Sequence, residues 1–210
     1  MQISYAITVC NEAQELDRLL SFLIKHKRDE DEILVQCDKD NTTKEVLDVL
    51  ADKYIDELKD DIKLIHFPLN KNFAAFKNNL KNNCTGDYIF QIDADEYPDP
   101  DLVATLPWIL EKNPDNEVYW VPRINIVNGI RAEHLERWHW HMDDNNRINF
   151  PDYQCRILKN IDRIKWKNKV HEVIIGHLSE AKLPTNDMYC LRHPKTIDRQ
   201  EEQNAFYNTL

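Results

Sequence analysis

Glycine is scarce in this sequence of 210 residues, which contains only Gly86, Gly129 and Gly176. A dinucleotide-binding G-x-G-x-x-G motif needs three glycines within six positions, and a P-loop needs two within six. Neither motif exists here, because each glycine is more than forty positions from the next. A nucleotide bound by this chain would therefore need something other than a glycine-rich loop to neutralise its phosphates.

Cysteines and long apolar runs are also few. The five cysteines are an odd number with no C-x-x-C pair, which excludes a disulfide framework or a cysteine-rich zinc site and favours a reducing, cytoplasmic location. No stretch approaches the roughly 18 consecutive apolar residues that span a bilayer. The first residues have neither the basic nor the apolar region of a signal peptide. We therefore expect a cytoplasmic protein with no integral membrane segment.

Positive charge is in the minority, with 27 Lys and Arg against 37 Asp and Glu and a net charge of −10. Non-specific binding to nucleic acid depends on clustered Lys and Arg that contact the phosphate backbone. Docking to anionic lipid depends on the same clusters. The balance predicts no nucleic-acid partner and no attachment to an acidic membrane surface.

The first half of the sequence alternates between two periodicities. Short runs rich in Ile, Val and Tyr predict strands, and apolar residues spaced by three and four positions predict the helices between them. The expected strands are 3–9, 33–37, 63–67 and 88–92, and the expected helices begin at Asn11, at Thr42 or Thr43, and at Phe73. This order predicts an α/β fold with a mostly parallel, Rossmann-like central sheet flanked by helices. Ligands of such sheets bind beyond the carboxyl ends of the strands.

The pattern weakens after about residue 115, which predicts a smaller, mixed half. Strands are expected at 118–122, 154–158 and 170–175, turn chemistry at 125–129, an irregular segment at 133–149, and a helix at 198–210. The sequence shows no internal repeat and no linker rich in Ser or Gly. We expect a single domain, 1–210, with one functional half at about 1–115 and the other at about 116–210.

The sharpest local feature is Asp93-Ala94-Asp95, which follows the fourth expected strand. Mg²⁺ and Mn²⁺ prefer carboxylate, phosphate and water oxygens, and they often use one or two protein carboxylates together with substrate phosphates. The two aspartates therefore fit a metal that bridges a nucleoside diphosphate. The alternative is an acidic turn in which Asp95, Glu96 and Asp99 merely open the next helix.

Six segments in chain order carry a further signal. They are YAITVCNE at 5–12, ILVQCD at 33–38, NKNFAAFKN at 70–78, GDYIFQIDADE at 86–96, DYQCRILKN at 152–160 followed by Trp166 and VHE at 170–172, and HPK at 193–195 with Arg199 and Gln200. Together they resemble glycosyltransferase family 2, whose fold is of the GT-A type, in the branch with D-x-Q-x-R and V-H-E blocks. The resemblance implies an inverting enzyme that moves a sugar from a nucleoside-diphosphate-sugar, a UDP-sugar among the candidates, to an acceptor hydroxyl.

The same resemblance implies roles for individual residues. It places Asp93, Asp95 and His193 around Mn²⁺ or Mg²⁺, which would stabilise the charge of the departing diphosphate. It assigns Asp38 to the base or ribose of the donor, with Asp40 as the alternative. Further donor-side residues are Thr8, Asn11 and Glu12 at the end of the first strand, Lys77 near the phosphates, and Ala94. Glu12 is equally suited to the N-terminus of a helix, and Lys77 to a solvated helix face.

The second half must supply the general base that deprotonates the acceptor, for which a carboxylate or histidine is suitable. The candidates are Asp152, His171 and Glu172; we expect Asp152 or Glu172 to be the base and His171 to lie on the donor or metal side. If 170–175 is a strand, His171 and Glu172 point to opposite faces, so only one of them reaches a given site.

Trp138-His139-Trp140-His141 lies where the family places its acceptor region, and aromatic faces commonly line carbohydrate sites. A hydrophobic plug under a long loop is the alternative. Zinc bound by His134, His139 and His141 is another.

The acceptor itself, whether a glycan, a lipid-linked sugar or a protein, is not specified by the sequence. The small second half is compatible with help from a second subunit in a homo-oligomer. Two other functions compete with sugar transfer. One is a different metal-dependent nucleotidyltransferase, and the other is a catalytically degenerate relative that only binds carbohydrate.

Overall fold

The structure is a computed structural model that describes residues 1–55 and 62–207. Within them, one mixed sheet runs in the order β3-β2-β1-β4-β7-β6-β11-β5, and β10 pairs with β6. The strands are β1 (Ile3–Val9), β2 (Glu32–Asp38), β3 (Ile62–Phe67), β4 (Tyr88–Asp93), β5 (Tyr97–Pro98), β6 (Val118–Asn128), β7 (Ile148–Lys159), β10 (Glu180–Lys182) and β11 (Leu191–Thr196). A separate antiparallel pair is formed by β8 (Lys165–Lys167) and β9 (Val173–Ile175).

The amino-terminal half of the sheet is parallel, as its continuously apolar strands predict. β1 lies between β2 and β4, and β3 completes this half at the edge. Thr8 pairs with Asp93, and Asp38 pairs with Phe67. The carboxyl ends of β1, β2 and β4 therefore lie at the same edge of the sheet, and this edge carries the acidic segments that the sequence singles out.

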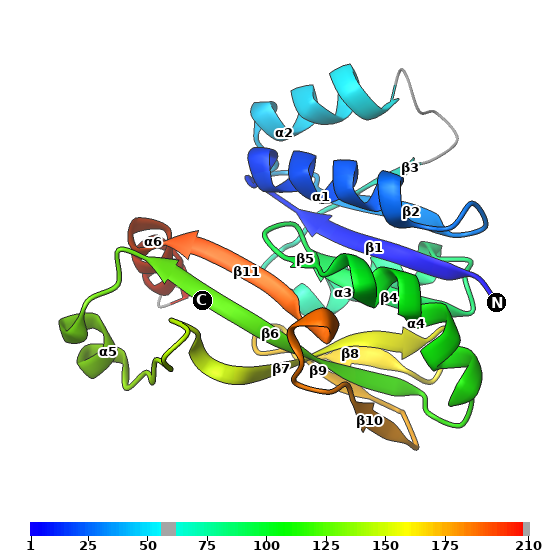
Figure 1. Cartoon of the computed structure of the whole chain (residues 1–210). Helices are drawn as coiled ribbons and strands as arrows, with labels where there is room; N and C mark the ends of the chain where they lie inside the picture. Colours follow the sequence, from blue (N-terminus) through cyan, green and yellow to red (C-terminus); the bar gives the residue numbers. More distant parts are fainter. Residues whose placement is uncertain (56–61, 208–210) are drawn as a thin grey trace.

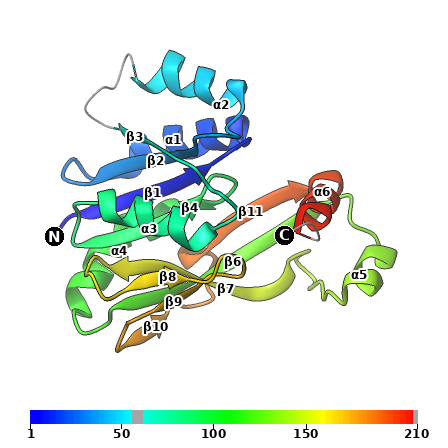
Figure 2. The ribbon, with the colours of Figure 1, turned by 180° about the vertical axis from the view of Figure 1, so that it is seen from behind.

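Two layers cover the sheet, as Figures 1 and 2 show from opposite sides. The first contains α1 (Ala13–His26), α2 (Lys44–Val49) with the π-helical turn η1 (Leu50–Ile55), and α4 (Pro100–Lys112). The second contains α3 (Phe73–Asn83) and the β8–β9 hairpin. Each layer has its own buried cluster. The cluster of the first layer includes Leu16, Leu19, Leu20 and Leu23 of α1, whose spacing of three and four positions makes one apolar face.

The second half of the chain differs from its expected pattern in three places. The expected turn at 125–129 is wrong, because 125–128 continue β6. The strand was hidden because polar side chains at 123 and 125 alternate along it and face a cavity. Helix α5 (Ala132–Trp138) lies within the segment expected to be irregular, and none of its residues is buried, so it has no apolar stripe.

The expected strand at 170–175 is the third difference. Only Val173–Ile175 is a strand, and His171 lies in a bend with a left-handed φ of 52°. The prediction that His171 and Glu172 face opposite sides of a strand is therefore wrong.

Helix α6 (Ile197–Tyr207) follows β11 and confirms the expected helix at 198–207, while 208–210 lie outside the described residues. In Figure 1 it lies across the end of β6 and β11, on the same side of the molecule as α5. Across residues 1–55 and 62–207, every helix is too short or too polar to traverse a bilayer.

Candidate functional site

A cavity of about 620 Å³ opens at the carboxyl edge of the parallel strands. Segments from both halves of the chain form its wall. They are the end of β1 (Thr8, Val9, Cys10, Glu12), Asp38, the start of α3 (Phe73, Phe76, Lys77), Asp93–Asp95, the middle of β6 (Arg123, Asn125, Val127), β7 (Ile148, Asn149, Asp152, Gln154, Arg156), Val170–Glu172, β11 (His193, Lys195) and α6 (Gln200, Gln203), with Leu69 and Trp140. The volume is that of an ordinary small-ligand pocket.

At the end of β1, Thr8 and Glu12 reach the cavity wall and Asn11 does not. The Thr8 hydroxyl donates to Asp93 Oδ1 over 3.1 Å. Glu12 folds back, so that its Oε2 accepts from the backbone N–H of Cys10 at 2.9 Å and of Asn11 at 3.0 Å. Asn11 itself is exposed and outside the wall, so its expected place beside a donor is not supported by the geometry.

Asp38 is buried and lies in the wall, whereas Asp40 is exposed and outside it. The Asp38 carboxylate accepts from the Leu69 and Asp40 backbone N–H groups at 3.1 and 3.2 Å, and from the Asn41 amide at 2.7 Å. It therefore orders the loop after β2 while presenting itself to the cavity. Of the two aspartates considered, only Asp38 can reach a ligand there.

Asp93 lies in the wall but is held by cationic neighbours. Arg156 Nη2 donates to its Oδ2 over 2.5 Å, and Lys77 Nζ lies 4.0 Å from its Oδ1. Burial opposes ionisation of this carboxyl, but the charges of Arg156 and Lys77 outweigh it and hold the pKa of Asp93 well below its usual range. Both oxygens of Asp93 thus have partners within the protein, which leaves it poorly suited to bind a metal ion directly.

Asp95 has a different neighbour, His193. Asp95 Oδ2 lies 3.1 Å from His193 Nε2, and His193 Nδ1 lies 2.7 Å from Asn125 Oδ1. Burial raises the pKa of Asp95, but the contact with His193 outweighs it and lowers the value to about 2. Among the described residues, no three His, Cys, Asp or Glu side chains group as a metal-binding set. Two protein ligands, Asp95 and His193, still fit Mg²⁺ or Mn²⁺ when substrate phosphates and water supply the others.

An ion network that the sequence did not reveal joins the cavity wall to the buried Glu96. Glu96 is fully buried and accepts from Arg123 Nη1 at 2.8 Å and from Arg156 Nε and Nη2 at 3.0 and 2.7 Å. It does not merely open the next helix. The alternation of Arg123, Asn125 and Val127 along one strand face was the signal that could have placed Arg123 at the site.

The two carboxylates considered as general bases have unequal surroundings. Asp152 accepts from Arg123 Nε and Nη2, from Asn125 and from Gln154, all within 2.9 Å. Burial opposes its ionisation, yet these partners outweigh burial and lower the pKa of Asp152. Glu172 Oε1 accepts from Lys77 Nζ over 2.5 Å. His171 adjoins Glu172 in the bend and also lines the cavity.

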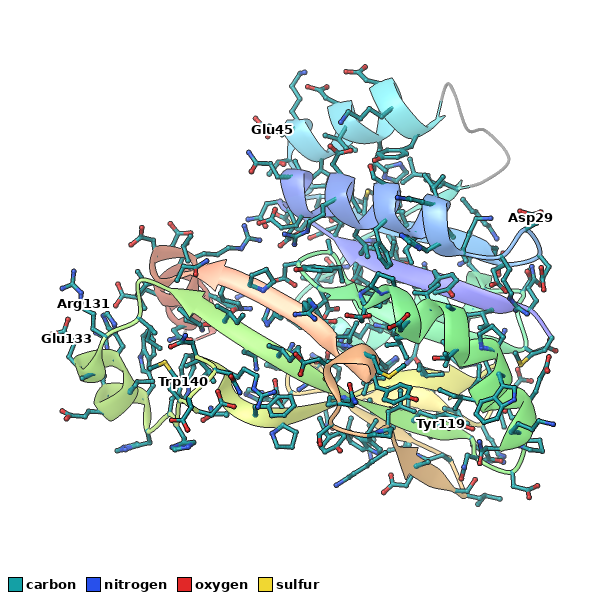
Figure 3. The ribbon with its side chains drawn as sticks, in the orientation of Figure 1. Asp29, Glu45, Tyr119, Arg131, Glu133 and Trp140 are labelled. Atoms are coloured by element: carbon teal, nitrogen blue, oxygen red, sulfur yellow. The ribbon has the colours of Figure 1, made fainter. Side chains whose placement is uncertain are left out.

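The aromatic segment at 138–141 reaches the cavity through one residue. Trp140 lines it, and Trp138 contacts Trp140 with ring centroids 4.8 Å apart. Figure 3 shows Trp140 on the inner side of α5, with Arg131 and Glu133 at the outer side. His134, His139 and His141 do not come together as a zinc site in the described structure, because His134 instead accepts from the backbone of Arg131 and stacks on Trp138.

Helix α6 closes one side of the cavity. Gln203 accepts from the buried Lys195 Nζ over 2.8 Å, and burial lowers the pKa of Lys195. Arg199 Nη2 donates to Glu12 Oε1 over 3.1 Å, which ties the helix to the end of β1. The cavity is therefore lined by carboxylates that are paired with cationic side chains, such as Asp93 with Arg156 and Glu172 with Lys77.

Comparison with known proteins identifies the family and the fold. The model of the family described as Glycosyl transferase family 2 matches residues 4–169, and the chain belongs to that family. Among curated proteins, none matches the chain.

Solved structures show the same fold. The crystal structure of S. aureus TarS 1-349 superposes with a TM-score of 0.64 at 15% identity, covering 92% of this chain and 60% of that one. Its complex with UDP-GlcNAc superposes with a TM-score of 0.65 at 15% identity, covering 93% of this chain and 59% of that one. The mannosyltransferase PcManGT from Pyrobaculum calidifontis, in complex with GDP-Man and Mn²⁺, superposes with a TM-score of 0.50 at 18% identity. The match covers 65% of this chain and 46% of that one.

These likenesses confirm the expected α/β fold of the GT-A type. The chain spans about three fifths of the length of the TarS structures that it matches.

Proposed function

We propose that this protein transfers a sugar, with inversion, from a nucleoside-diphosphate-sugar to an acceptor hydroxyl, with the help of Mn²⁺ or Mg²⁺. The observation that carries this is one cavity that is lined by Asp38, by the Asp95–His193 pair and by the cations Lys77 and Lys195. Family membership supports the reaction class. The nucleotide sugars in the TarS and PcManGT complexes support the class of donor.

The wall suggests how the donor lies. Asp38 and Thr8, at the ends of β2 and β1, suit the nucleoside. The diphosphate then lies at Asp95 and His193, the residues that would hold the metal, with Lys77 as a further cation and the Ala94 backbone beside it. When bound, the divalent ion would act as a Lewis acid on the leaving diphosphate. Asp93 serves by fixing Arg156 and Lys77 around the phosphates rather than by binding the metal.

For the base we propose Glu172 in preference to Asp152. Every oxygen of Asp152 accepts from Arg123, Asn125 or Gln154, and its lowered pKa makes it a weak proton acceptor. Glu172 accepts from Lys77 over 2.5 Å, and the donor phosphates can compete for that cation. The acceptor oxygen then bonds to the anomeric carbon, its proton passes to Glu172, and the diphosphate leaves with the electron pair of the broken C–O bond.

The wider assignments follow from the same arrangement. The cavity draws on both halves of the chain, which supports one functional domain, 1–210, in the branch with D-x-Q-x-R and V-H-E blocks. The five cysteines are free thiols, which fits a reducing compartment such as the cytoplasm. The acceptor is a glycan, a lipid-linked sugar or a protein, and a second copy of the chain is a candidate to complete its site.

A donor panel tests the proposal. Thermal shift with UDP-, GDP- and other nucleotide sugars, with and without Mn²⁺, should raise the melting temperature for the true donor. That donor should then release nucleoside diphosphate. Release of pyrophosphate would instead indicate a nucleotidyltransferase, and sugar binding without release would indicate a degenerate relative.

Two variants test the base. Glu172→Gln should reduce kcat by a factor of about 100 or more while donor binding survives. Asp152→Asn should retain much more activity. The reverse ranking would contradict the assignment of Glu172.

A further inference from the structure

A chain of hydrogen bonds links Asp95 to Asp152, for which no contact with the donor is proposed. Asp95 faces His193, His193 faces Asn125, and the Asn125 amide nitrogen donates to Asp152 Oδ2 over 2.8 Å. Asp152 is in turn held by Arg123, which is also bound to the buried Glu96. The far end of the chain is thereby anchored in the core of the molecule.

The direction of each hydrogen bond follows from the one before it. Asp152 is ionised, since its neighbours lower its pKa, so it can only accept. The Asn125 amide therefore points its nitrogen at Asp152 and its oxygen at His193 Nδ1. Because an amide oxygen only accepts, His193 must carry a proton on Nδ1 and donate it over 2.7 Å.

This tautomer determines what His193 presents to Asp95. In a neutral ring with Nδ1 protonated, Nε2 holds a lone pair. That lone pair faces Asp95 Oδ2 at a distance of 3.1 Å, which places two acceptors against each other. The arrangement is stable only with a positive charge between them, supplied by a proton or by a metal ion. Histidines that bind metals commonly have this pattern, with the other ring nitrogen donating to a fixed oxygen.

We infer that Asn125, oriented by Asp152, is a positioning residue that fixes the tautomer of His193 so that Nε2 and Asp95 together bind the divalent ion. The inference rests on the proposed function for the identity of that ion. It gives Asp152 a task other than proton removal: to keep the Asn125 amide from flipping.

The test measures metal binding directly. Mn²⁺ is titrated into the protein in the presence of UDP and followed by electron paramagnetic resonance, and echo-modulation spectra report a nitrogen ligand on Mn²⁺. Asn125→Leu should weaken Mn²⁺ binding by about 10- to 100-fold and reduce the nitrogen signal. The matched control is Asn128→Leu, an exposed asparagine on the same strand, which should leave both unchanged.

A conservative variant separates positioning from packing. In the single variant Asp152→Asn, the amide oxygen can take the place of Asp152 Oδ2 and accept from Arg123 and from the Asn125 amide nitrogen, so Mn²⁺ affinity should stay within about threefold of the wild type. Weak Mn²⁺ binding by this folded variant would overturn the inference, as would wild-type affinity and nitrogen signal in Asn125→Leu. If His193→Ala binds Mn²⁺ normally, the inference fails while sugar transfer stands. If no donor releases its diphosphate, the proposed function fails, but the measurement of Mn²⁺ binding still decides the inference about Asn125.

Discussion

Replacing Arg156 by methionine should destabilise the protein strongly, because it removes the cation that joins two carboxylates under the cavity. Arg156 is 4% exposed and makes three hydrogen bonds, two to Glu96 and one to Asp93. Methionine fills a similar volume, so the main loss is electrostatic. Removing one partner of a buried ion pair costs about 3–5 kcal/mol, since the other charge stays buried without compensation. Arg123 still pairs with Glu96, which favours the lower part of this range.

Thermal and urea unfolding followed by circular dichroism measure the effect. For a chain of this size, about 3–5 kcal/mol corresponds to a fall in Tm of about 6–20 °C. Arg137→Met is the control, because Arg137 and its partner Glu201 are about half exposed, and such a pair contributes at most about 1 kcal/mol. Equal changes in Tm for the two variants, or no change for Arg156→Met, would refute the view that this network stabilises the site.

Three further predictions concern pH, backbone and metal. Glu32 accepts from Ser4 and from the Thr85 and Gly86 backbone N–H groups; burial opposes its ionisation, but these bonds outweigh burial and lower its pKa. The contribution of ionised Glu32 to the free energy of unfolding is therefore complete above the unfolded-state pKa of about 4.3 and is lost as pH falls. In urea unfolding, the difference in stability between the wild type and Glu32→Gln should shrink from about pH 5 to pH 3. Gly176→Ala should lower the free energy of unfolding by at least about 1 kcal/mol, because φ is +87° and the new Cβ would lie against the Arg163 carbonyl. Gly129→Ala should lower Tm less, because its new Cβ would meet only the Ile197 side chain. EDTA should abolish nucleoside-diphosphate release and Mn²⁺ or Mg²⁺ should restore it, so full activity in chelator would exclude the metal from the mechanism.

The first half of the fold could be predicted because local pattern and final structure agree there. The strand at 3–9 matches β1, which is buried along almost its whole length, and the helix at 73–83 matches α3, although the buried face of α3 includes Lys77 and Lys81. The second half could not be predicted as well. β6 and β7 contain the polar residues that line the cavity, so their alternation resembles turn chemistry, and the place of β11 between β6 and β5 depends on long-range pairing.

The candidate site shows the same division. The rule that ligands bind at the carboxyl ends of parallel strands placed Thr8, Asp38 and Asp95 at one cavity before any coordinates. It could not show that Asp93 would be held by Arg156, or that Asp152 would be surrounded by donors, because both partnerships join residues far apart in the sequence. The roles of these residues in catalysis stay predictions until the variants are measured.

The bond between Arg199 and Glu12 joins segments 187 positions apart. Because α6 also contributes Gln200 and Gln203 to the cavity wall, the cavity is complete only after α6 has been synthesised and has packed in place. Contacts so distant in sequence form slowly. A chain that stops before residue 199 would lack this bond and both glutamines, which would leave that side of the cavity open.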